Sequence, residues 1–307
     1  MSKKQLEGIE KFNRVSAPTN AIFTAIFAIL ALTCIIPVIF VVIISFSSQE
    51  SIALNGYSFW PTSWSLEAYR YLWTSREMIG KAFLVSITVT VVGTALGLFL
   101  TCTMGYVLSR PNFKLKGIWT WIVFIPMIFS GGLVATYNVY TSTLHIGDSL
   151  WVLILPMLVS SFNVTIAKTF FKTTVPDSII ESGKIDGAPQ LRIFFQLVLP
   201  ICLPLLATIG LFLAFAYWND WWLSLMYINN RDLYSLQAVL MSVEKNIEFL
   251  ANNPEQLGIS ASEYKASMPK ESMRMAMAVV IIFPIACAYP FFQRYFVSGL
   301  TIGAVKG

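Results

Sequence analysis

The sequence predicts an all-α membrane protein with six transmembrane helices and with both termini on the cytoplasmic side. Apolar residues make up 56% of the 307 residues and charged residues 12%, which leaves too few polar groups to cover a water-soluble domain. Six stretches of about 20 residues lack Asp, Glu, Lys and Arg, and a helix of that length crosses the hydrocarbon core of a bilayer. We therefore expect a multi-pass protein of the cell (inner) membrane, with lipid as a partner.

The expected spans are helices because their apolar runs do not alternate as the strands of a membrane barrel do. They cover residues 21–46, 82–105, 118–137, 150–167, 196–217 and 275–293. The first run is far longer than the apolar core of a cleavable signal peptide, so we expect it to stay in the membrane. Residues 1–20 then form a cytoplasmic N-terminal segment, and residues 21–307 form the transmembrane domain.

Basic residues predict the orientation of these spans. The N-terminus, residues 106–117, residues 168–195 and the C-terminus hold thirteen Lys and Arg against five Asp and Glu, whereas the remaining segments hold eight against eleven. Because Lys and Arg are enriched on the cytoplasmic side, the first set lies inside, and the long segments 47–81 and 218–274 lie outside. This topology accounts for the net charge of +5 without a nucleic-acid partner.

The cytoplasmic segment 168–195 carries local signals for a short helix and a sharp turn. Thr174 and Asp177 have the spacing of a capping box, with Pro176 in the first turn, where its missing N–H is tolerated. Residues 179–186 then form about two turns, and Gly187 can adopt the left-handed conformation that ends a helix. On these signals alone, an ordinary capped loop explains the segment as well as a functional lever does.

The spacing of the residues that follow resembles the EAA motif of the permease subunits of binding-protein-dependent ATP-binding cassette (ABC) importers. The family pattern is roughly EAAxxDGAxxxxxFxxxxLPxxxP. The matching positions are Glu181, Asp186, Gly187, Ala188, Phe194, Leu199, Pro200 and Pro204. Ser182 and Gly183 replace the usual Ala-Ala, and Gly183 is expected to weaken the helix by up to about 1 kcal/mol relative to Ala.

In that family the motif forms a coupling helix that sits in a cleft of a separate ATPase subunit, within the type I ABC importer permease fold. The resemblance implies an ATPase-coupling site made of Glu181, Ser182, Lys184, Asp186, Gly187 and Ala188. It also implies a second homologous permease subunit, two ATP-binding subunits and an extracytoplasmic solute-binding protein as partners. The chain has no GxxxxGK(S/T) phosphate-binding loop, so ATP and Mg are expected at the partner ATPases. No catalytic residue and no bound cofactor are expected here.

Four further stretches are similar to the carbohydrate-type permeases related to the smaller permease of the maltose importer. YVLSRPNFKLKG at 106–117 resembles their "YALSR" cytoplasmic loop. Residues 129–137, 151–171 and 217–228 resemble a subgroup that imports oligosaccharides, including uronate-containing ones. The resemblance thus implies import of a carbohydrate.

Sugars are bound by aromatic faces together with amide and carboxylate groups. Residues of these types near the expected outer ends and within the spans give the candidates for the substrate pathway: Trp218, Asn219, Asp220, Trp222, Tyr137, Asn138 and Asn163. An interfacial aromatic belt explains any single aromatic member somewhat better than sugar binding does. Hydrogen bonds between helices explain Asn138 and Asn163.

Other functions stay open at this point. An ion-coupled secondary transporter normally keeps a charged residue within a span, and no expected span contains one. An ABC importer permease for a non-sugar solute fits the EAA motif as well. The four cysteines lie in apolar runs without CxxC spacing, which indicates neither a metal site nor a disulfide framework.

Overall fold

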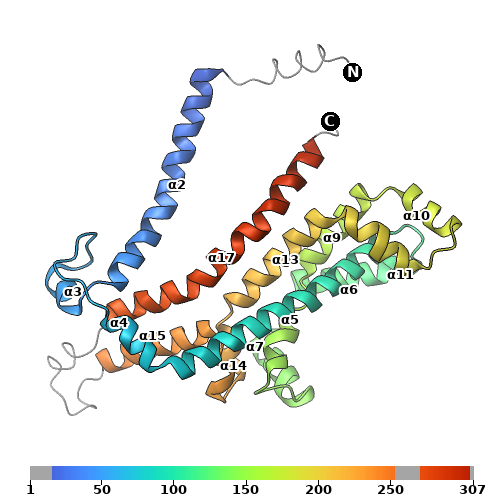
Figure 1. Cartoon of the computed structure of the whole chain (residues 1–307). Coiled ribbons are helices and arrows are strands. Elements are labelled where there is room, and N and C mark those ends of the chain that lie inside the picture. Colours follow the sequence, from blue (N-terminus) through green and yellow to red (C-terminus); the bar gives the residue numbers. More distant parts are fainter. Residues whose placement is uncertain (1–15, 253–269, 305–307) are drawn as a thin grey trace. The chain divides into compact units, whose positions relative to one another are not determined.

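The computed structural model describes residues 16–252 and 270–304, and this part of the chain is helical apart from turns and an isolated antiparallel bridge between Ser47 and Trp64 (Figure 1). In chain order the helices are α2 (Ala17–Ser45), α3 (Gln49–Asn55), α4 (Glu67–Thr74), α5 (Arg76–Ser109), α6 (Lys116–Ile128), α7 (Leu133–Asn138), η1 (Val139–Thr143), α8 (Leu150–Ile154), η2 (Leu155–Met157), α9 (Ser161–Thr174), α10 (Asp177–Ile185), α11 (Gln190–Arg192), η3 (Ile193–Val198), α12 (Leu199–Ile201), α13 (Leu203–Trp218), α14 (Trp222–Tyr227), η4 (Arg231–Leu233), α15 (Leu236–Asn252) and α17 (Lys270–Ala304). The chain divides into two compact units. One comprises Met1–Tyr71 with Ile259–Val279, and the other comprises Leu72–Gly258 with Val280–Gly307.

The first unit is built on α2, a helix of 29 residues that is about 44 Å long at 1.5 Å per residue. Pro18 lies in its first turn, where backbone N–H groups have no partner within the helix. Ser48 caps the next helix, α3, because its Oγ accepts the N–H of Ser51 at 3.0 Å. The Tyr57 hydroxyl then donates to the Glu271 carboxylate at 2.6 Å, which ties the segment after α3 to the first turn of α17.

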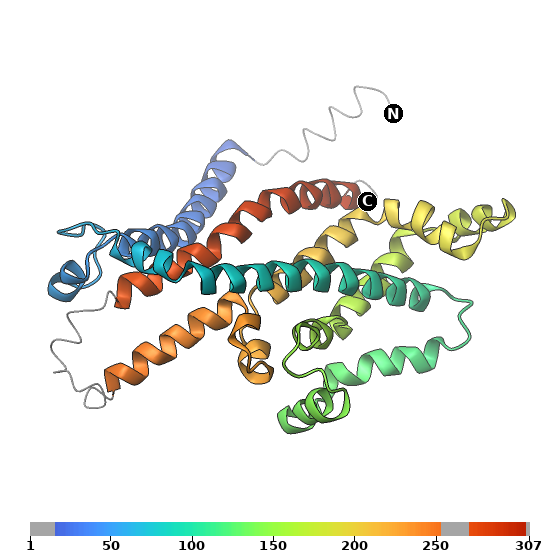
Figure 2. The ribbon, with the colours of Figure 1, turned by 60° about the horizontal axis from the view of Figure 1, so that its bottom comes forward.

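The second unit is organised around α5, whose 34 residues pack along both α9 and α13 (Figure 2). Glycines allow this close approach. A Cβ atom on Gly105 would lie 2.5 Å from the Cβ of Ala167 on α9, and one on Gly93 would lie 2.5 Å from the ring of Tyr217 on α13. Small residues at such crossings let two helix backbones come close together.

The core of this unit lies where α5, α8, α9, η3 and α13 meet. Its fully buried side chains are Val152, Ala167, Phe171, Ile193, Val198, Cys202 and Ile209. Ile193, Phe194 and Val198 on η3 therefore face inward, although only α11 separates η3 from a charged turn. This arrangement places the charged turn at one end of the core.

Three of the six expected spans are interrupted. Residues 118–137 form α6 and α7 with a bend of 120°, residues 150–167 bend by 48° before α9, and residues 196–217 bend by 85° before α13. Gly132 has φ +82° at the first break, and the third break lies between Pro200 and Pro204, each of which removes a backbone hydrogen bond.

Within the described residues, three helices are long and apolar enough to cross a membrane alone: Ala17–Ser45, Arg76–Ser109 and Glu271–Pro290. The number rises to as many as six if each bent pair counts as one span. Length and composition thus fit the expected number of spans only when the interrupted stretches are counted.

Candidate functional site

The start of α10 differs from the expected capping box. Thr174 is the last residue of α9, Pro176 occupies the N-cap position, and Asp177 is the first helical residue. Proline restricts the residue before it to extended conformations, and Val175 has φ −100° and ψ 104°, so the helix cannot begin earlier. The capping-box prediction is therefore wrong, and the Asp177 carboxylate binds Arg110 instead.

The end of α10 confirms the turn predicted at Gly187. This glycine has φ +75°, a conformation that a side chain disfavours. The Gly187 N–H donates to the Lys184 carbonyl at 3.0 Å, and the Ala188 N–H donates to the Gly183 carbonyl at 3.0 Å. These two bonds form a Schellman motif. Pro189 then occupies the N-cap position of α11, so four residues, 186–189, link the two helices.

One face of α10 is buried against η3. Ile180 is 5% exposed, and Gly183 is buried as well. A Cβ on Gly183 would lie 3.1 Å from both Ile193 Cγ1 and Leu197 Cδ1, which is tighter than ordinary contact. The glycine that weakens α10 as an isolated helix therefore lets it lie closer to η3, and the packing contact offsets part of the propensity cost.

The opposite face of α10 is open. Among the predicted coupling residues, the exposed ones are Glu181, Ser182, Lys184, Asp186 and Gly187, whereas Ala188 is half-buried against the core. Two large apolar side chains stand beside the charges, Ile185 at 85% exposure and Leu191 at 72%. Exposed apolar side chains rimmed by charges of both signs are typical of a protein-binding surface.

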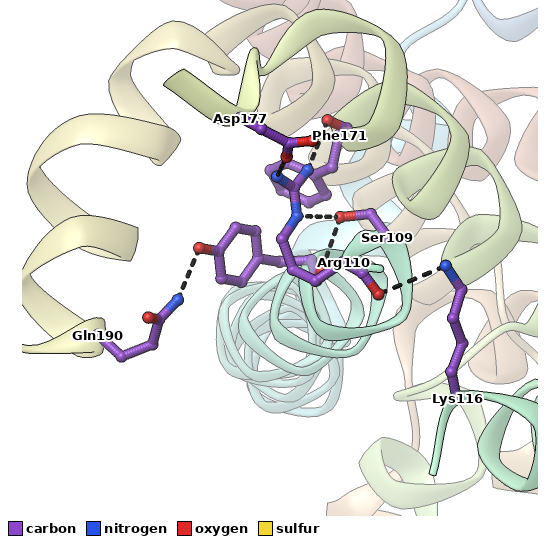
Figure 3. Close-up of polar contacts among 7 residues, drawn as sticks. Ser109, Arg110, Lys116, Phe171, Asp177 and Gln190 are labelled. Atoms are coloured by element: carbon purple, nitrogen blue, oxygen red, sulfur yellow. Dashed lines mark hydrogen bonds and ion pairs between the residues drawn. The ribbon is translucent and has the colours of Figure 1, made fainter. Parts of the chain in front are cut away.

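The residue after α5, Arg110, joins three helices at the start of α10 (Figure 3). Its guanidinium donates to Asp177 Oδ1 at 2.9 Å, to the Phe171 carbonyl at 3.0 Å and to Ser109 Oγ at 2.9 Å. The Arg110 side chain is only 14% exposed. The Phe171 carbonyl lies in the last turn of α9 and also accepts the N–H of Val175 at 3.3 Å, so the cation adds a second bond at that helix end and interacts favourably with its dipole.

One turn earlier on α5, Tyr106 reaches the other flank of α10. Its hydroxyl accepts a hydrogen bond from Gln190 Nε2 at 2.8 Å, and its ring lies 5.3 Å below the Arg110 guanidinium carbon. The ring also contacts Phe171 and Phe194, with centroids 5.8 Å and 4.9 Å apart. The last turn of α5 therefore holds the chain on both sides of α10, a role for the YVLSR stretch that sequence reasoning missed.

Two of the predicted sugar-binding residues make structural bonds. Trp218 is 7% exposed, its indole N–H donates to the Ile281 carbonyl at 3.2 Å, and its ring meets Phe83 edge-on at 6.1 Å. Asn219 is exposed, and its Nδ2 donates to the Phe215 carbonyl at 2.8 Å, which caps the end of α13. Burial of Trp218 leaves little of its ring for a ligand.

Asp220 is half-buried in the turn between α13 and α14. Its Oδ2 accepts the Leu223 N–H at 3.2 Å, and its backbone carbonyl accepts a bond from Ser235 Oγ at 2.9 Å. Burial of the carboxyl raises the pKa of Asp220 to about 6, although the backbone N–H groups of Leu223 and Trp222 act in the opposite direction. Asp220 thus organises the turn and carries a proton more readily than an exposed Asp does.

The remaining candidates fall in two places. Tyr137 on α7 is 40% exposed and stacks on Tyr227, the last residue of α14, with centroids 5.4 Å apart. Trp222, the first residue of α14, is 45% exposed. The helix α14 therefore carries Trp222 at one end and the contact with Tyr137 at the other. Asn138 is exposed next to Tyr137. Asn163 lies apart from them on α9 and is 6% exposed.

The N-terminal part of α5 holds a second set of bonds that sequence reasoning missed. Ser86 Oγ accepts the N–H of Leu236, the first residue of α15, at 2.8 Å. Lys81 Nζ lies 3.1 Å from Asp232 Oδ1. The two residues of each pair are about 150 positions apart in the chain, so no local sequence pattern predicts either contact.

The described residues offer an exposed surface on α10 that is suited to binding. Among them, no group of three His, Cys, Asp or Glu side chains is placed to hold a metal ion. Cys102 and Cys202 are buried in the apolar core. The open face of α10 carries charged and apolar groups suited to contact with another protein.

Comparison with known proteins identifies relatives of this chain. No protein-family model matches it. The chain is 38% identical over 277 residues to the polygalacturonan/rhamnogalacturonan transport system permease protein YtcP of Bacillus subtilis, covering 90% of this chain and 94% of the relative. It is 36% identical to protein LplC of the same organism, covering 89% and 90%. The arabinooligosaccharides transport system permease protein AraQ of Halalkalibacterium halodurans is 26% identical over 92% of this chain and 94% of its own length.

A solved structure shares the fold. It belongs to a bacterial ABC transporter involved in the import of the acidic polysaccharide alginate, and it matches 92% of this chain and 100% of its own chain with a TM-score of 0.76 at 22% identity. The identities of 38% to YtcP and 36% to LplC show that the chain belongs to the permease subunits of ABC importers. Within them it is of the carbohydrate type, a transport subunit rather than an enzyme.

Proposed function

We propose that this chain is the transmembrane permease of an ATP-driven importer in the cell membrane, and that it translocates an oligosaccharide delivered by an extracytoplasmic solute-binding protein. The observation that carries the proposal is the geometry of α10. Its charged face is open, while its other face and both of its flanks are fixed to α5, α9 and η3. A surface held this firmly is suited to receive a force from another subunit.

In this proposal the three long helices and the three bent pairs make six spans. Residues 1–20 are a cytoplasmic segment, residues 21–307 are the permease domain, and both termini lie inside. The distribution of Lys and Arg supports this orientation. It places α10 on the cytoplasmic side, where ATPase subunits are found.

Five exposed residues of the α10 turn are proposed to contact an ATPase subunit: Glu181, Ser182, Lys184, Asp186 and Gly187. Ala188 is assigned a different role, because it packs against the core and so anchors the turn. ATP and Mg bind at the partner ATPases in this scheme. Each of two ATPases meets the α10 of one permease, which requires a second homologous permease subunit.

The segments proposed to lie outside, 47–81 and 218–274, are the docking area for the solute-binding protein. On that side we assign the substrate pathway to the exposed aromatic and amide groups of Trp222, Tyr137 and Asn138. Asn163 on α9 is as buried as Trp218, so we assign it to helix packing rather than to the pathway. Trp218, Asn219 and Asp220 shape the turn that carries Trp222.

The substrate class follows from the relatives. YtcP is named for polygalacturonan and rhamnogalacturonan transport, and AraQ for arabinooligosaccharides. We propose an oligosaccharide that contains acidic sugars, because the relative with the higher identity of these two is named for uronate polymers.

The test is uptake of a labelled oligogalacturonide into proteoliposomes that hold the complete importer, with ATP supplied on the cytoplasmic side. Glu181→Ala should abolish most uptake without lowering the amount of permease. Glu50→Ala is the matched control, since Glu50 is also an exposed acidic residue, and it belongs to α3 in the segment proposed to lie outside.

Uptake that continues without ATP and follows an imposed ion gradient would replace the proposal with an ion-coupled secondary transporter. ATP-driven uptake of a different solute, with none of the oligosaccharide, would keep the ABC mechanism and overturn the substrate class.

A further inference from the structure

We propose that Arg110 and Tyr106 are positioning residues that lock α10 to α5, so that a displacement of α10 is passed along the whole of α5. This inference rests on the proposed function, because it assumes that a partner moves α10. It goes further by naming the joint through which that movement leaves the coupling site, a joint outside the EAA motif.

The first half of the joint is the Arg110 fork. Three donors on one planar guanidinium meet the α10 carboxylate of Asp177, the α9 carbonyl of Phe171 and the α5 hydroxyl of Ser109 (Figure 3). An exposed ion pair alone would fix little, and Asp177 is 66% exposed. The bonds to the carbonyl and the hydroxyl set the direction of the guanidinium, which lysine cannot reproduce with a single ammonium group.

The second half of the joint is the bond between Tyr106 and Gln190. Tyr106 precedes Arg110 by four residues, a spacing that puts both on one face at the end of α5. Asp177 opens α10, and Gln190 opens the next helix after the Gly187 turn. Because α5 holds the chain before and after α10, α10 cannot shift relative to α5 without breaking one of these contacts.

The far end of α5 is fastened as well. At about 1.5 Å per residue, its 34 residues span roughly 51 Å. Near its N-terminus the buried Ser86 Oγ accepts the N–H of Leu236 in the first turn of α15, and the exposed pair of Lys81 with Asp232 in η4 adds little to this bond. A force applied at α10 thus reaches the segment that follows Asp220 through one helix with bonded ends.

A purely static role for the joint makes a different prediction. If Arg110 and Tyr106 only stabilise the fold, their loss lowers the amount of assembled importer, and each assembled copy still imports normally. If they transmit movement, ATP is still hydrolysed but less substrate enters for each ATP. The ratio of uptake to ATP hydrolysis in the same vesicles separates the two roles.

The experiment compares Arg110→Lys with Arg192→Lys in the complete importer, reconstituted with its ATPases and binding protein. Arg192 is an exposed arginine on α11, so it receives the same substitution outside the joint. We expect Arg110→Lys to lower uptake per ATP by about tenfold, the order of effect of losing charge-assisted hydrogen bonds, while Arg192→Lys leaves the ratio unchanged.

Tyr106→Phe is the second variant, because it removes one oxygen and keeps the ring contacts. It should lower the ratio severalfold and should have no additional effect in a chain that already carries Gln190→Leu. An unchanged ratio in both Arg110→Lys and Tyr106→Phe overturns the inference. If the importer with Arg110→Lys fails to assemble, the ratio of uptake to ATP hydrolysis in Tyr106→Phe alone tests the inference. A wild-type importer without ATP-driven uptake would instead refute the proposed function, so the two failures are distinguishable.

Discussion

The two ends of α5 carry different kinds of contact. At the C-terminal end, the residues predicted to bind a partner remain exposed on α10, and other residues from α5 hold that helix in place. Near the N-terminal end, several residues predicted to bind sugar are themselves bonded into the turn after α13. A binding surface is therefore recognised less by its residue types than by whether other residues support it.

The largest expected effect tests the helix that joins the two ends. Gly105→Leu should destabilise the chain by about 3 kcal/mol, because its side chain would overlap Ala167 on α9. Thermal unfolding of the detergent-solubilised protein measures the change. Gly117→Leu is the control, since a Cβ there meets nothing within 4 Å. Equal melting temperatures for the two variants would contradict tight packing of α5 on α9.

Asp220 should make the turn after α13 sensitive to pH. Its folded pKa of about 6 lies above the ordinary value of 3.8, so the folded chain binds a proton more tightly than the unfolded chain does. Stability contributed by this group is present below pH 4 and is lost as the pH rises through 6, by up to about 3 kcal/mol. Asp220→Asn should remove this dependence. Parallel unfolding curves for both proteins between pH 4 and 7 would argue against a buried carboxyl.

A tryptophan pair separates structural from exposed aromatic residues. Trp218→Phe should cost about 1–2 kcal/mol, because the Ile281 carbonyl loses its indole donor. Trp222→Phe should change stability by less than about 0.5 kcal/mol, because Trp222 is 45% exposed. Under the proposed function, Trp222→Phe instead lowers substrate uptake. A larger loss of stability in Trp222→Phe than in Trp218→Phe would show that Trp218, not Trp222, is the residue free to contact a ligand.

The smallest expected effect concerns the bond between α5 and α15. Ser86→Ala should destabilise the chain by about 1 kcal/mol, because the Leu236 N–H loses its acceptor in a buried position. Thr88→Val on the exposed side of the same helix is the control. If both substitutions are neutral in chemical unfolding, the N-terminal end of α5 is not fastened as described.

Much of the local structure could be predicted from the sequence. The helices around 21–46, 82–105 and 275–293 are confirmed, because an unbroken apolar run of this length is itself the cause of a long helix. The turn at Gly187 is confirmed for a similar reason, since the signal and the structure occupy the same few residues. The false capping box at Thr174 shows the limit, because α9 extends through that residue for reasons of packing.

The amino-acid sequence by itself determined the membrane class, the long helices and the charged turn that resembles the EAA motif, since these depend on composition and on neighbours in the chain. Only the tertiary structure decided that Arg110 meets Asp177 across 67 positions, that Trp218 is buried, and that three apolar stretches bend. The physical reason is range: hydrophobicity and turn geometry act locally, whereas burial and hydrogen-bond partners are set by segments that only folding brings together.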